Sequence, residues 1–213
     1  NVIAGGSVEF TADGTSLGSV SGYTDNPYTK TYTVPSDATG DILISGSYSL
    51  DGADTPVVKT GVIHPAVMYW FIEGKGGYEF LSDAVADAEN GDVIYGNPGT
   101  YVISNTIAIN KNLAIKANET GSIILDGDGS TIFNISSANL DLINLTLMNG
   151  SSNNGGLIYM LGTTSSNNVL NIINCTLKDS QASTSGGAIY ANYGNITIDN
   201  SLFTGLKAKN GAG

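Results

Sequence analysis

The segment Leu140-Asp-Leu-Ile-Asn-Leu-Thr-Leu147 recurs with small changes as Leu170-Asn-Ile-Ile-Asn-Cys-Thr-Leu177 and as Ile196-Thr-Ile-Asp-Asn-Ser-Leu-Phe203. The copies begin 30 and then 26 residues apart. Within each copy apolar and polar residues alternate, which is the period of a β-strand. A self-similar unit of this length is typical of a solenoid. Short strands repeated once per turn therefore predict a parallel β-helix.

One position of every copy holds an asparagine: Asn144, Asn174 and Asn200. A coil has to turn sharply between two strands, and Asn adopts the left-handed backbone conformation more readily than most residues. Stacked coils lie about 4.8 Å apart, so we expect the three amides to hydrogen-bond one above another as an inward-facing structural ladder. The alternative is that Asn is simply abundant in this chain.

The first two copies are each followed by the motif Gly-Gly-x-Ile-Tyr, which ends at Tyr159 and Tyr190. If Ile158 and Ile189 point inward, alternation turns both tyrosines outward, one coil spacing apart. With Tyr193 nearby they form a candidate ligand-binding site, because flat rings with a polar tip suit sugar faces or a partner protein. The alternative is that the two rings stack on each other and only stabilise the coil.

The chain is acidic, with 19 Asp and Glu against 8 basic residues and a net charge of −11 at pH 7. All eight basic residues are lysines. Nucleic-acid binding needs a cationic surface, and anionic membranes repel an acidic protein. We therefore expect no nucleic-acid partner and no membrane contact by this segment. The single cysteine, Cys175, replaces Leu145 and Ser201 of the sister repeats, which predicts a buried residue rather than a reactive thiol.

Residues 1–64 differ from the repeats. Short alternating runs at 7–10 and 29–34 are separated by turn signals, a pattern typical of an antiparallel β-sandwich. The stretches 6–18 and 46–52 resemble bacterial Ig-like repeat domains of large surface proteins. We expect an Ig-like β-sandwich over residues 1–64 and the β-helix over residues 65–213, with the C-terminus cut in the middle of a repeat.

The β-helix is expected to begin with a cap. Trp70 and its aromatic neighbours predict a strand that packs against the solenoid end, with a sugar-stacking face as the alternative. Residues 80–89 predict a short amphipathic helix, because Leu81, Val85 and Ala88 fall on one face, with Ser82 as its N-cap. Such a helix would cover the open apolar end of the first coil. We expect coils to start near residues 93, 113, 140, 170 and 196.

This helix, followed by Gly91-Asp-Val-Ile94, Pro98-Gly-Thr-Tyr101 and Ile123-Ile-Leu-Asp-Gly127, resembles the N-terminal entry of right-handed parallel β-helix proteins. That superfamily includes pectate-lyase-like enzymes and many surface adhesins. The segments Ile173-Asn-Cys-Thr176 and Gly186-Gly-Ala-Ile-Tyr190 resemble repeats of adhesin-like surface proteins, notably those of methanogenic archaea. The resemblance implies an all-β chain, with an Ig-like β-sandwich followed by a right-handed parallel β-helix that carries a short N-terminal capping α-helix.

Catalysis is not expected from these residues. The resemblance implies that lyases of this class use an acidic Ca²⁺ site and an Arg or Lys base, and this chain has no Arg. Hydrolases need two facing carboxylates, whereas Asp141 and Asp199 lie two registers apart in the aligned repeats. The one histidine, His64, lies between the two predicted domains without an obvious partner. We therefore expect no enzyme, no catalytic residue and no cofactor.

Two other kinds of site have candidates. Asp126 and Asp128 offer oxygen ligands for Ca²⁺, although a glycine-rich turn is the favoured interpretation. Among the Asn-x-Ser/Thr sequons, Asn118, Asn149 and Asn195 are candidate glycosylation sites. No metal is assigned.

These features predict an extracellular, non-catalytic segment of a larger adhesin-like cell-surface protein. It would serve cell adhesion by binding glycans or partner proteins on other cells, held out by a stiff rod. One alternative is a fragment of a polysaccharide lyase or hydrolase of the β-helix class, which two carboxylates stacked on one exposed sheet would favour. The other is a purely structural stalk.

Overall fold

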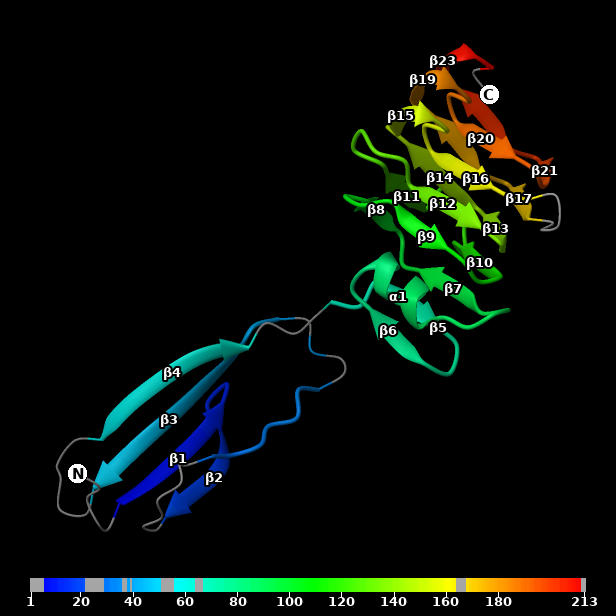
Figure 1. The fold of residues 1–213 in the computed structure, drawn as a ribbon. Helices are drawn as coiled ribbons and strands as arrows, with labels where there is room; N and C mark the ends of the chain where they lie inside the picture. The colour runs from blue at the N-terminus through cyan, green and yellow to red at the C-terminus, as the bar shows by residue number, and fades with distance from the viewer. Residues whose placement is uncertain are drawn as a thin grey trace. The chain divides into compact units, whose positions relative to one another are not determined.

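The computed structural model describes residues 6–21, 29–35, 38, 40–50, 56–63, 67–163 and 168–211. The chain divides into two compact units, Asn1–Val67 and Met68–Gly213. Strands dominate both units (Figure 1), which confirms the predicted all-β class. The predicted boundary between residues 64 and 65, together with His64, lies outside the described residues.

The N-terminal unit contains one antiparallel sheet in the order β2-β1-β3-β4. Its strands are β1 (Gly6–Ala12), β2 (Thr15–Ser21), β3 (Ile42–Leu50) and β4 (Val57–Ile63). The β1–β2 hairpin turns at Asp13 and Gly14, both with positive φ (45° and 78°), as a tight hairpin requires. The described residues thus form one antiparallel sheet, and the second, facing sheet that the expected sandwich requires is not among them.

The second unit is a solenoid of stacked parallel strands (Figure 1). We call its four sheets the first (β21-β17-β13-β10-β7-β5-β6), second (β22-β18-β14-β11-β8), third (β20-β16-β12-β9) and fourth (β15-β19-β23) sheets. The pairs β5–β6 and β5–β7 are antiparallel, and all other pairs in this unit are parallel.

The strands of the first sheet are β5 (Trp70–Ile72), β6 (Gly76–Tyr78), β7 (Val93–Gly96), β10 (Leu113–Lys116), β13 (Asn139–Ile143), β17 (Val169–Ile173) and β21 (Asn195–Asp199). Those of the second are β8 (Gly99–Val102), β11 (Ile123–Asp126), β14 (Leu145–Met148), β18 (Thr176–Lys178) and β22 (Leu202–Thr204). The third has β9 (Ile107–Ile109), β12 (Phe133–Ser136), β16 (Ile158–Leu161) and β20 (Ile189–Asn192), and the fourth β15 (Ser151–Asn154), β19 (Gln181–Ser185) and β23 (Lys207–Asn210).

The sequence repeat is the structural repeat. Leu140 pairs with Leu170, and Leu170 with Ile196, in the first sheet. Leu147, Leu177 and Phe203 align in the same way in the second sheet. The first-sheet strands β7, β10, β13, β17 and β21 begin within one residue of the predicted coil starts. The predicted parallel β-helix is therefore confirmed.

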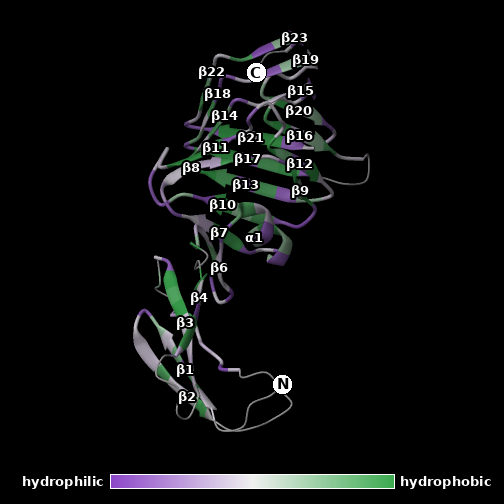
Figure 2. Cartoon of the chain, turned by 90° about the vertical axis from the view of Figure 1, so that its left-hand side faces the viewer, coloured by the Kyte–Doolittle hydropathy of each residue, from purple (hydrophilic) through white to green (hydrophobic). Residues whose placement is uncertain are grey.

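Alternation places one side of each strand in the solenoid interior. Leu140, Leu142, Leu170 and Ile172 are fully buried, and similar positions recur from strand to strand (Figure 2). Burying a Leu or Ile side chain contributes about 1.5–3 kcal/mol. The stacked apolar rows therefore supply most of the driving force for folding this unit.

The corner between the first and second sheets uses the repeated asparagines. Asn144, Asn174 and Asn200 have φ of 63°, 52° and 45°, the left-handed region that Asn tolerates. Asn200 Nδ2 donates to Asn174 Oδ1 at 2.6 Å, whereas Asn144 Nδ2 donates to the Ala117 carbonyl at 2.9 Å. The side chains of Asn144 and Asn174 are half-buried at the corner and that of Asn200 is exposed, so the prediction that they face inward is wrong. The positive φ places these residues at the turn between two sheets rather than on an inward-facing strand position.

Helix α1 (Leu81–Asp87) lies at the β7 end of the solenoid, and its residues Leu81, Ala84 and Val85 are buried in the same core. Its N-cap is Phe80, without a side-chain hydrogen bond, so the prediction of Ser82 as N-cap is wrong by two residues. The ammonium of Lys111 donates to the carbonyls of Val85, Ala86 and Ala88 at 3.3, 2.6 and 2.7 Å. It thereby satisfies carbonyls that a helix end leaves unpaired.

Within the described part of the chain, no helix has the length and apolar character needed to cross a membrane.

Candidate functional site

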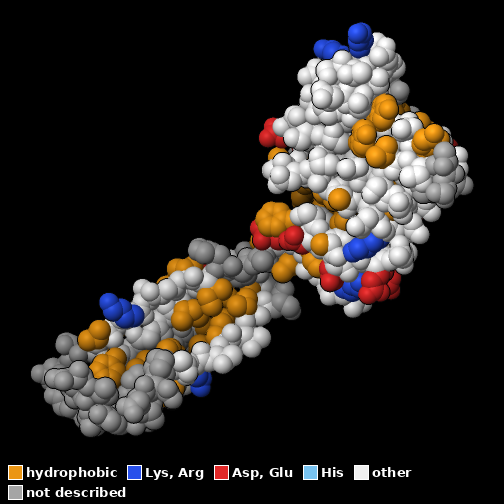
Figure 3. Space-filling view, viewed as in Figure 1, with side chains coloured by type: hydrophobic (Ala, Val, Ile, Leu, Met, Phe, Trp, Pro, Cys, Tyr) orange, Lys and Arg blue, Asp and Glu red, His pale blue; other side chains and the backbone are white. Residues whose placement is uncertain are grey.

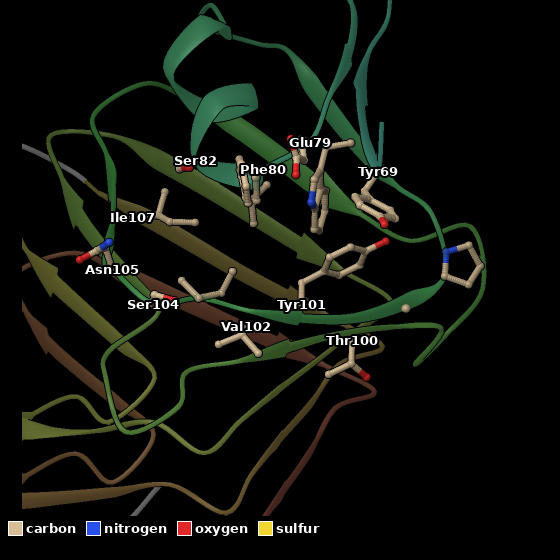
Figure 4. A pocket seen from close by; sticks show the side chains of 15 residues that line it. Tyr69, Glu79, Phe80, Ser82, Thr100, Tyr101, Val102, Ser104, Asn105 and Ile107 are labelled. Carbon is tan, nitrogen blue, oxygen red and sulfur yellow. The ribbon is translucent and has the colours of Figure 1, made fainter. Parts of the chain in front are cut away.

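A cavity of about 550 Å³ opens beside the start of α1, within the second unit. This volume lies in the range of small-molecule sites. We call it the cap cavity. Its lining residues come from β5, from the loop before α1, from α1 itself, and from β8 and the loop to β9 (Figure 4). They are Tyr69, Trp70, Glu79, Phe80, Leu81, Ser82, Pro98, Gly99, Thr100, Tyr101, Val102, Ile103, Ser104, Asn105 and Ile107.

Trp70 is the buried indole of this site. Its side chain is 1% exposed, and the residue pairs with Gly96 across the β5–β7 ladder. A Cβ on Gly96 would lie 2.7 Å from the indole and 2.6 Å from the Ile123 side chain. Glycine in a strand often marks such a close approach. Gly96 therefore makes room for the ring that forms one wall of the cavity.

Three more aromatic rings face the cavity. The Tyr101 ring lies 4.8 Å from Trp70 at 54° and 5.6 Å from Tyr69 at 67°, between centroids. Tyr69, Phe80 and Tyr101 project toward the same space (Figure 4). Tyr69 is 37% exposed and Phe80 57%. The exposed area of Tyr69 and Phe80 is therefore free to contact a ligand.

The backbone holds this arrangement in place. The amide of Tyr69 donates to the Tyr78 carbonyl at 2.9 Å, and the Asn97 amide donates to the Tyr69 carbonyl at 2.8 Å. The Tyr101 hydroxyl donates to the Asn97 carbonyl at 2.7 Å. Burial, and to a smaller extent the neighbouring Tyr69, raise the pKa of Tyr101. The hydrogen bond to Asn97 holds the phenol ring in place at the cavity wall.

The polar groups of the cavity sit around this aromatic wall. Ser82, Ser104 and Asn105 are exposed and offer hydroxyl and amide groups. Among the described residues that line the cavity, Glu79 is the one with a charged side chain. The arrangement can bind and orient a ligand that has both an apolar face and hydroxyl groups.

The predicted tyrosine pair lies elsewhere, on the third sheet. Tyr159 and Tyr190 pair in register, are half-buried, and stack with centroids 5.4 Å apart at an angle of 11°. Each ring therefore turns one of its faces to the other, and those two faces are closed to a ligand. Tyr193 is 55% exposed and has a positive φ of 59° in the turn after β20. Ligand binding by these three residues stays a prediction.

Of the two candidate calcium ligands, Asp126 has both carboxylate oxygens engaged within the protein. Asp126 Oδ1 accepts from the Asp128 amide at 2.9 Å, and its Oδ2 accepts from Asn149 Nδ2 at 3.0 Å. Asp128 has a positive φ of 44° in this turn. In the part of the chain that the structure describes, no three His, Cys, Asp or Glu side chains gather into a cluster suited to a metal ion.

The candidate glycosylation residues Asn118, Asn149 and Asn195 are all exposed. Asn149 is the one whose amide is engaged, because its Nδ2 donates to Asp126. Cys175 is 2% exposed, and burial raises the pKa of its thiol. The expectation of a buried cysteine is confirmed.

The carboxylates of the first sheet do not form a catalytic pair. Asp141 lies beside Asn171, whose Nδ2 donates to Asp141 Oδ1 at 2.7 Å. Asp199 pairs with Ile173, at a different register. Two facing carboxylates, as a glycosidase requires, are therefore not provided by these two residues.

The sequence pattern predicted that Trp70 and its aromatic neighbours pack against the solenoid end, with a sugar-stacking face as the alternative. The burial of Trp70 confirms the packing. The pattern did not bring Tyr69, Phe80 and Tyr101 together around one cavity. The available signal was a set of aromatic residues on both sides of the predicted helix, with Gly96 in the strand that follows. These residues do not repeat, so the solenoid pattern could not place them.

No protein-family model matches the chain, and no curated protein matches it in sequence. A search of solved structures finds an arginine-to-alanine variant of AlyGC, an alginate lyase of family PL6, with 27% sequence identity and a TM-score of 0.46. The match covers 67% of this chain and 21% of that chain. This chain thus spans about a fifth of the length of the matched protein.

The comparison contradicts the prediction of a non-catalytic, adhesin-like segment, because the matched protein is a polysaccharide lyase rather than an adhesin. The prediction that the chain is not an enzyme is contradicted in the same way. The adhesin-like and archaeal resemblances find no support either. The fold of this chain could not decide between these functions, since one fold carries many activities.

Proposed function

We propose that this chain binds a sugar unit of a polysaccharide in the cap cavity, as part of a β-helix lyase or hydrolase. The observation that carries the proposal is the geometry of the cavity: aromatic rings with free area around about 550 Å³, bordered by hydroxyl, amide and carboxylate groups. A pyranose has the matching surface. Its C–H faces pack on aromatic rings, and its equatorial hydroxyls need hydrogen-bond partners at the edge.

The role of the cavity is binding rather than bond cleavage. It holds one carboxylate, that of Glu79, whereas hydrolysis of a glycosidic bond needs two. The Tyr101 hydroxyl is bound to the Asn97 carbonyl. In a longer protein such a site would fix the position of the polysaccharide relative to groups that cleave it, since positioning is itself a large part of catalysis.

The single tryptophan makes the proposal directly testable. Trp70 is the only Trp in the sequence and forms a wall of the cavity. Intrinsic fluorescence therefore reports on the site without a label. Titration with defined hexasaccharides, such as β-1,4-linked glucose, mannose and xylose oligomers, should give saturable changes in emission for at least one sugar.

Two variants localise the response. Phe80→Ala should weaken binding at least about 10-fold, because a desolvated ring contact contributes more than about 1 kcal/mol. Tyr190→Ala removes a comparable amount of aromatic surface on the third sheet and should leave the titration unchanged. Equal affinity of Phe80→Ala and the parent chain for every sugar, or loss of binding in Tyr190→Ala alone, would move the site away from the cap cavity.

A further inference from the structure

We infer that a second sugar-binding site lies in a groove at the corner between the second and fourth sheets, and that one polysaccharide chain contacts this groove and the cap cavity together. The inference rests on the proposed function and extends the bound segment of polysaccharide. The groove has a volume of about 340 Å³, within the range of small-molecule sites. We call it the corner groove, and its lining includes the side chains of Asn149, Ser151, Asp179, Gln181 and Lys207.

The corner groove and the cap cavity lie along the same corner of the solenoid, the one that follows the second sheet. Val102, Asp126, Met148 and Lys178 pair in succession from β8 to β18 in that sheet. Val102 and the loop after β8 line the cap cavity, and the turns after β14, β18 and β22 line the corner groove. A ligand that leaves the cavity across the strands of the second sheet therefore reaches the groove without crossing to another face.

The distance between the two sites suits a polysaccharide. In the second sheet, β14 and β18 lie two and three strand spacings from β8, which is about 10 and 14 Å. A sugar unit of an extended polysaccharide has nearly the length of one strand spacing. About two or three units therefore bridge the sites, and a chain of about five or six units fills both.

Hydrogen bonds within the protein hold the corner between the two sites. Asn149 Nδ2 donates to Asp126 Oδ2 at 3.0 Å, and the Asp128 amide donates to Asp126 Oδ1 at 2.9 Å. One coil further on, the Asp179 amide donates to the Thr204 carbonyl at 3.1 Å. The turns that form the groove are thus fixed before a ligand arrives, which lowers the entropic cost of binding.

Three side chains form a polar column along one wall of the groove. Ser151 pairs with Gln181, and Gln181 with Lys207, in the fourth sheet. Gln181 and Lys207 are exposed, and Gln181 Nε2 donates to Ser151 Oγ at 3.5 Å. The column offers hydroxyl, amide and ammonium groups to the hydroxyls or carboxylates of a sugar chain. Lysine side chains are visible at the β23 end of the solenoid unit in Figure 3.

Asp179 adds a carboxylate acceptor to these donors. Its side chain is 58% exposed, in the turn after β18. A Cβ on Gly205 would collide with Asp179 Oδ1, so this glycine leaves room for the carboxylate at the groove. Sugar hydroxyls both donate and accept, and the groove presents partners for both roles. It therefore complements the aromatic cap cavity with hydrogen bonds to the units that follow.

The test measures how binding depends on the length of the oligosaccharide, with Trp70 emission as the readout. Oligomers from dimer to octamer serve as probes, made of β-1,4-linked glucose, mannose or xylose, or of mannuronate or guluronate. For the series that binds best, the affinity should rise at least about 10-fold from trimer to hexamer, because the second site is then engaged by a ligand already held in the first. Beyond about six units the affinity should change little.

The double variant Gln181→Ala, Lys207→Ala removes the amide and the ammonium of the groove at exposed positions. It should bind the hexamer at least about 10-fold more weakly than the parent chain does, and should bind the trimer as the parent chain does. The matched control is Lys209→Ala, which removes the same charge from an exposed residue of β23 outside the groove lining. It should keep the gain in affinity with length.

The outcomes separate the two claims. Equal affinities of the parent chain for trimer and hexamer would overturn the inference, as would a gain with length that survives in the double variant or is lost equally in Lys209→Ala. Each of these results leaves the proposed function intact, because the trimer still reports on the cap cavity. If no oligomer of any series changes the Trp70 emission, the proposed function fails, and the inference that rests on it fails with it.

Discussion

Two aromatic groups on the solenoid differ in what their rings contact. Tyr159 and Tyr190 stack nearly in parallel, so each ring covers one face of the other. In the cap cavity, Tyr69 and Tyr101 are tilted at 67° and Phe80 is 57% exposed, so ring area stays free. Exposed aromatic residues therefore do not by themselves make a binding surface. In a regular repeat, equivalent aromatic residues stack on each other. In the non-repeating cap, the aromatic residues stay available to contact a ligand.

The largest loss of stability should come from disrupting the packing of α1 against the first coil. Val85 is 5% exposed on the buried side of α1. Val85→Asp places an unpaired charge in the core of the first coil and should lower the free energy of unfolding by at least about 3 kcal/mol. Chemical denaturation followed by circular dichroism measures this. Asp83→Ala, at an exposed position of the same helix, should change it by less than about 0.5 kcal/mol, and similar losses in the two variants would disprove the packing described for α1.

Next in size is Gly96→Ala. The added methyl group would contact the Trp70 indole at 2.7 Å and the Ile123 side chain at 2.6 Å. Overpacking of this kind costs about 1–3 kcal/mol, and it should also shift the Trp70 emission and weaken sugar binding. Gly61→Ala is the control, because a Cβ there meets nothing within 4 Å. An unchanged emission spectrum in Gly96→Ala would show that the indole does not depend on this glycine.

A smaller loss of stability is expected from a change in the stacked tyrosine pair of the third sheet. Tyr190→Ala removes the stacked pair, which is worth about 0.5–1.5 kcal/mol, and should lower thermal stability by that amount. Sugar binding should stay as in the parent chain. If Tyr190→Ala instead keeps its melting temperature and loses affinity, the third sheet rather than the cap cavity carries the ligand.

The smallest effect concerns the segment that leads to Glu79 and Phe80. The Tyr78 hydroxyl donates to the Asp87 carboxylate, which with partial burial raises the pKa of Tyr78 from 10.0 to about 12. The folded state holds this proton more tightly than the unfolded state does. The contribution is therefore complete below pH 10 and is lost as the pH rises to about 12.

Melting temperatures of the parent chain and Tyr78→Phe test this. The advantage of the parent chain should shrink as the pH is raised from about 9 to about 12. Asp87→Asn should remove the same pH dependence. An advantage that stays constant across this interval would mean that the Tyr78–Asp87 hydrogen bond is not formed in solution.

The repeated part of the fold could be predicted because its signals are local and occur several times. Alternation set the inward rows at Leu140, Leu170 and Ile196, and the turn asparagines adopt the left-handed conformation that the pattern required. The sandwich was harder, since sheet-to-sheet packing leaves no repeat in the sequence. The described residues of that unit form a single sheet.

The site could not be predicted from the same signals. The cap cavity depends on where an antiparallel strand, a loop and a helix meet the first coil, and each of these occurs once. Trp70 and Gly96 are neighbours across a ladder, but only the tertiary structure shows that the glycine makes room for the indole. The tyrosine motif, by contrast, was visible because it repeats, and repetition favours the stacking that covers its rings.

Titration of Trp70 fluorescence with neutral hexasaccharides, on the parent chain, Phe80→Ala and Tyr190→Ala side by side, tests the central claim most directly. The account predicts saturable binding that is weakened at least about 10-fold by Phe80→Ala and unaffected by Tyr190→Ala. No response to any sugar, or binding that is lost with Tyr190→Ala and retained with Phe80→Ala, would contradict it.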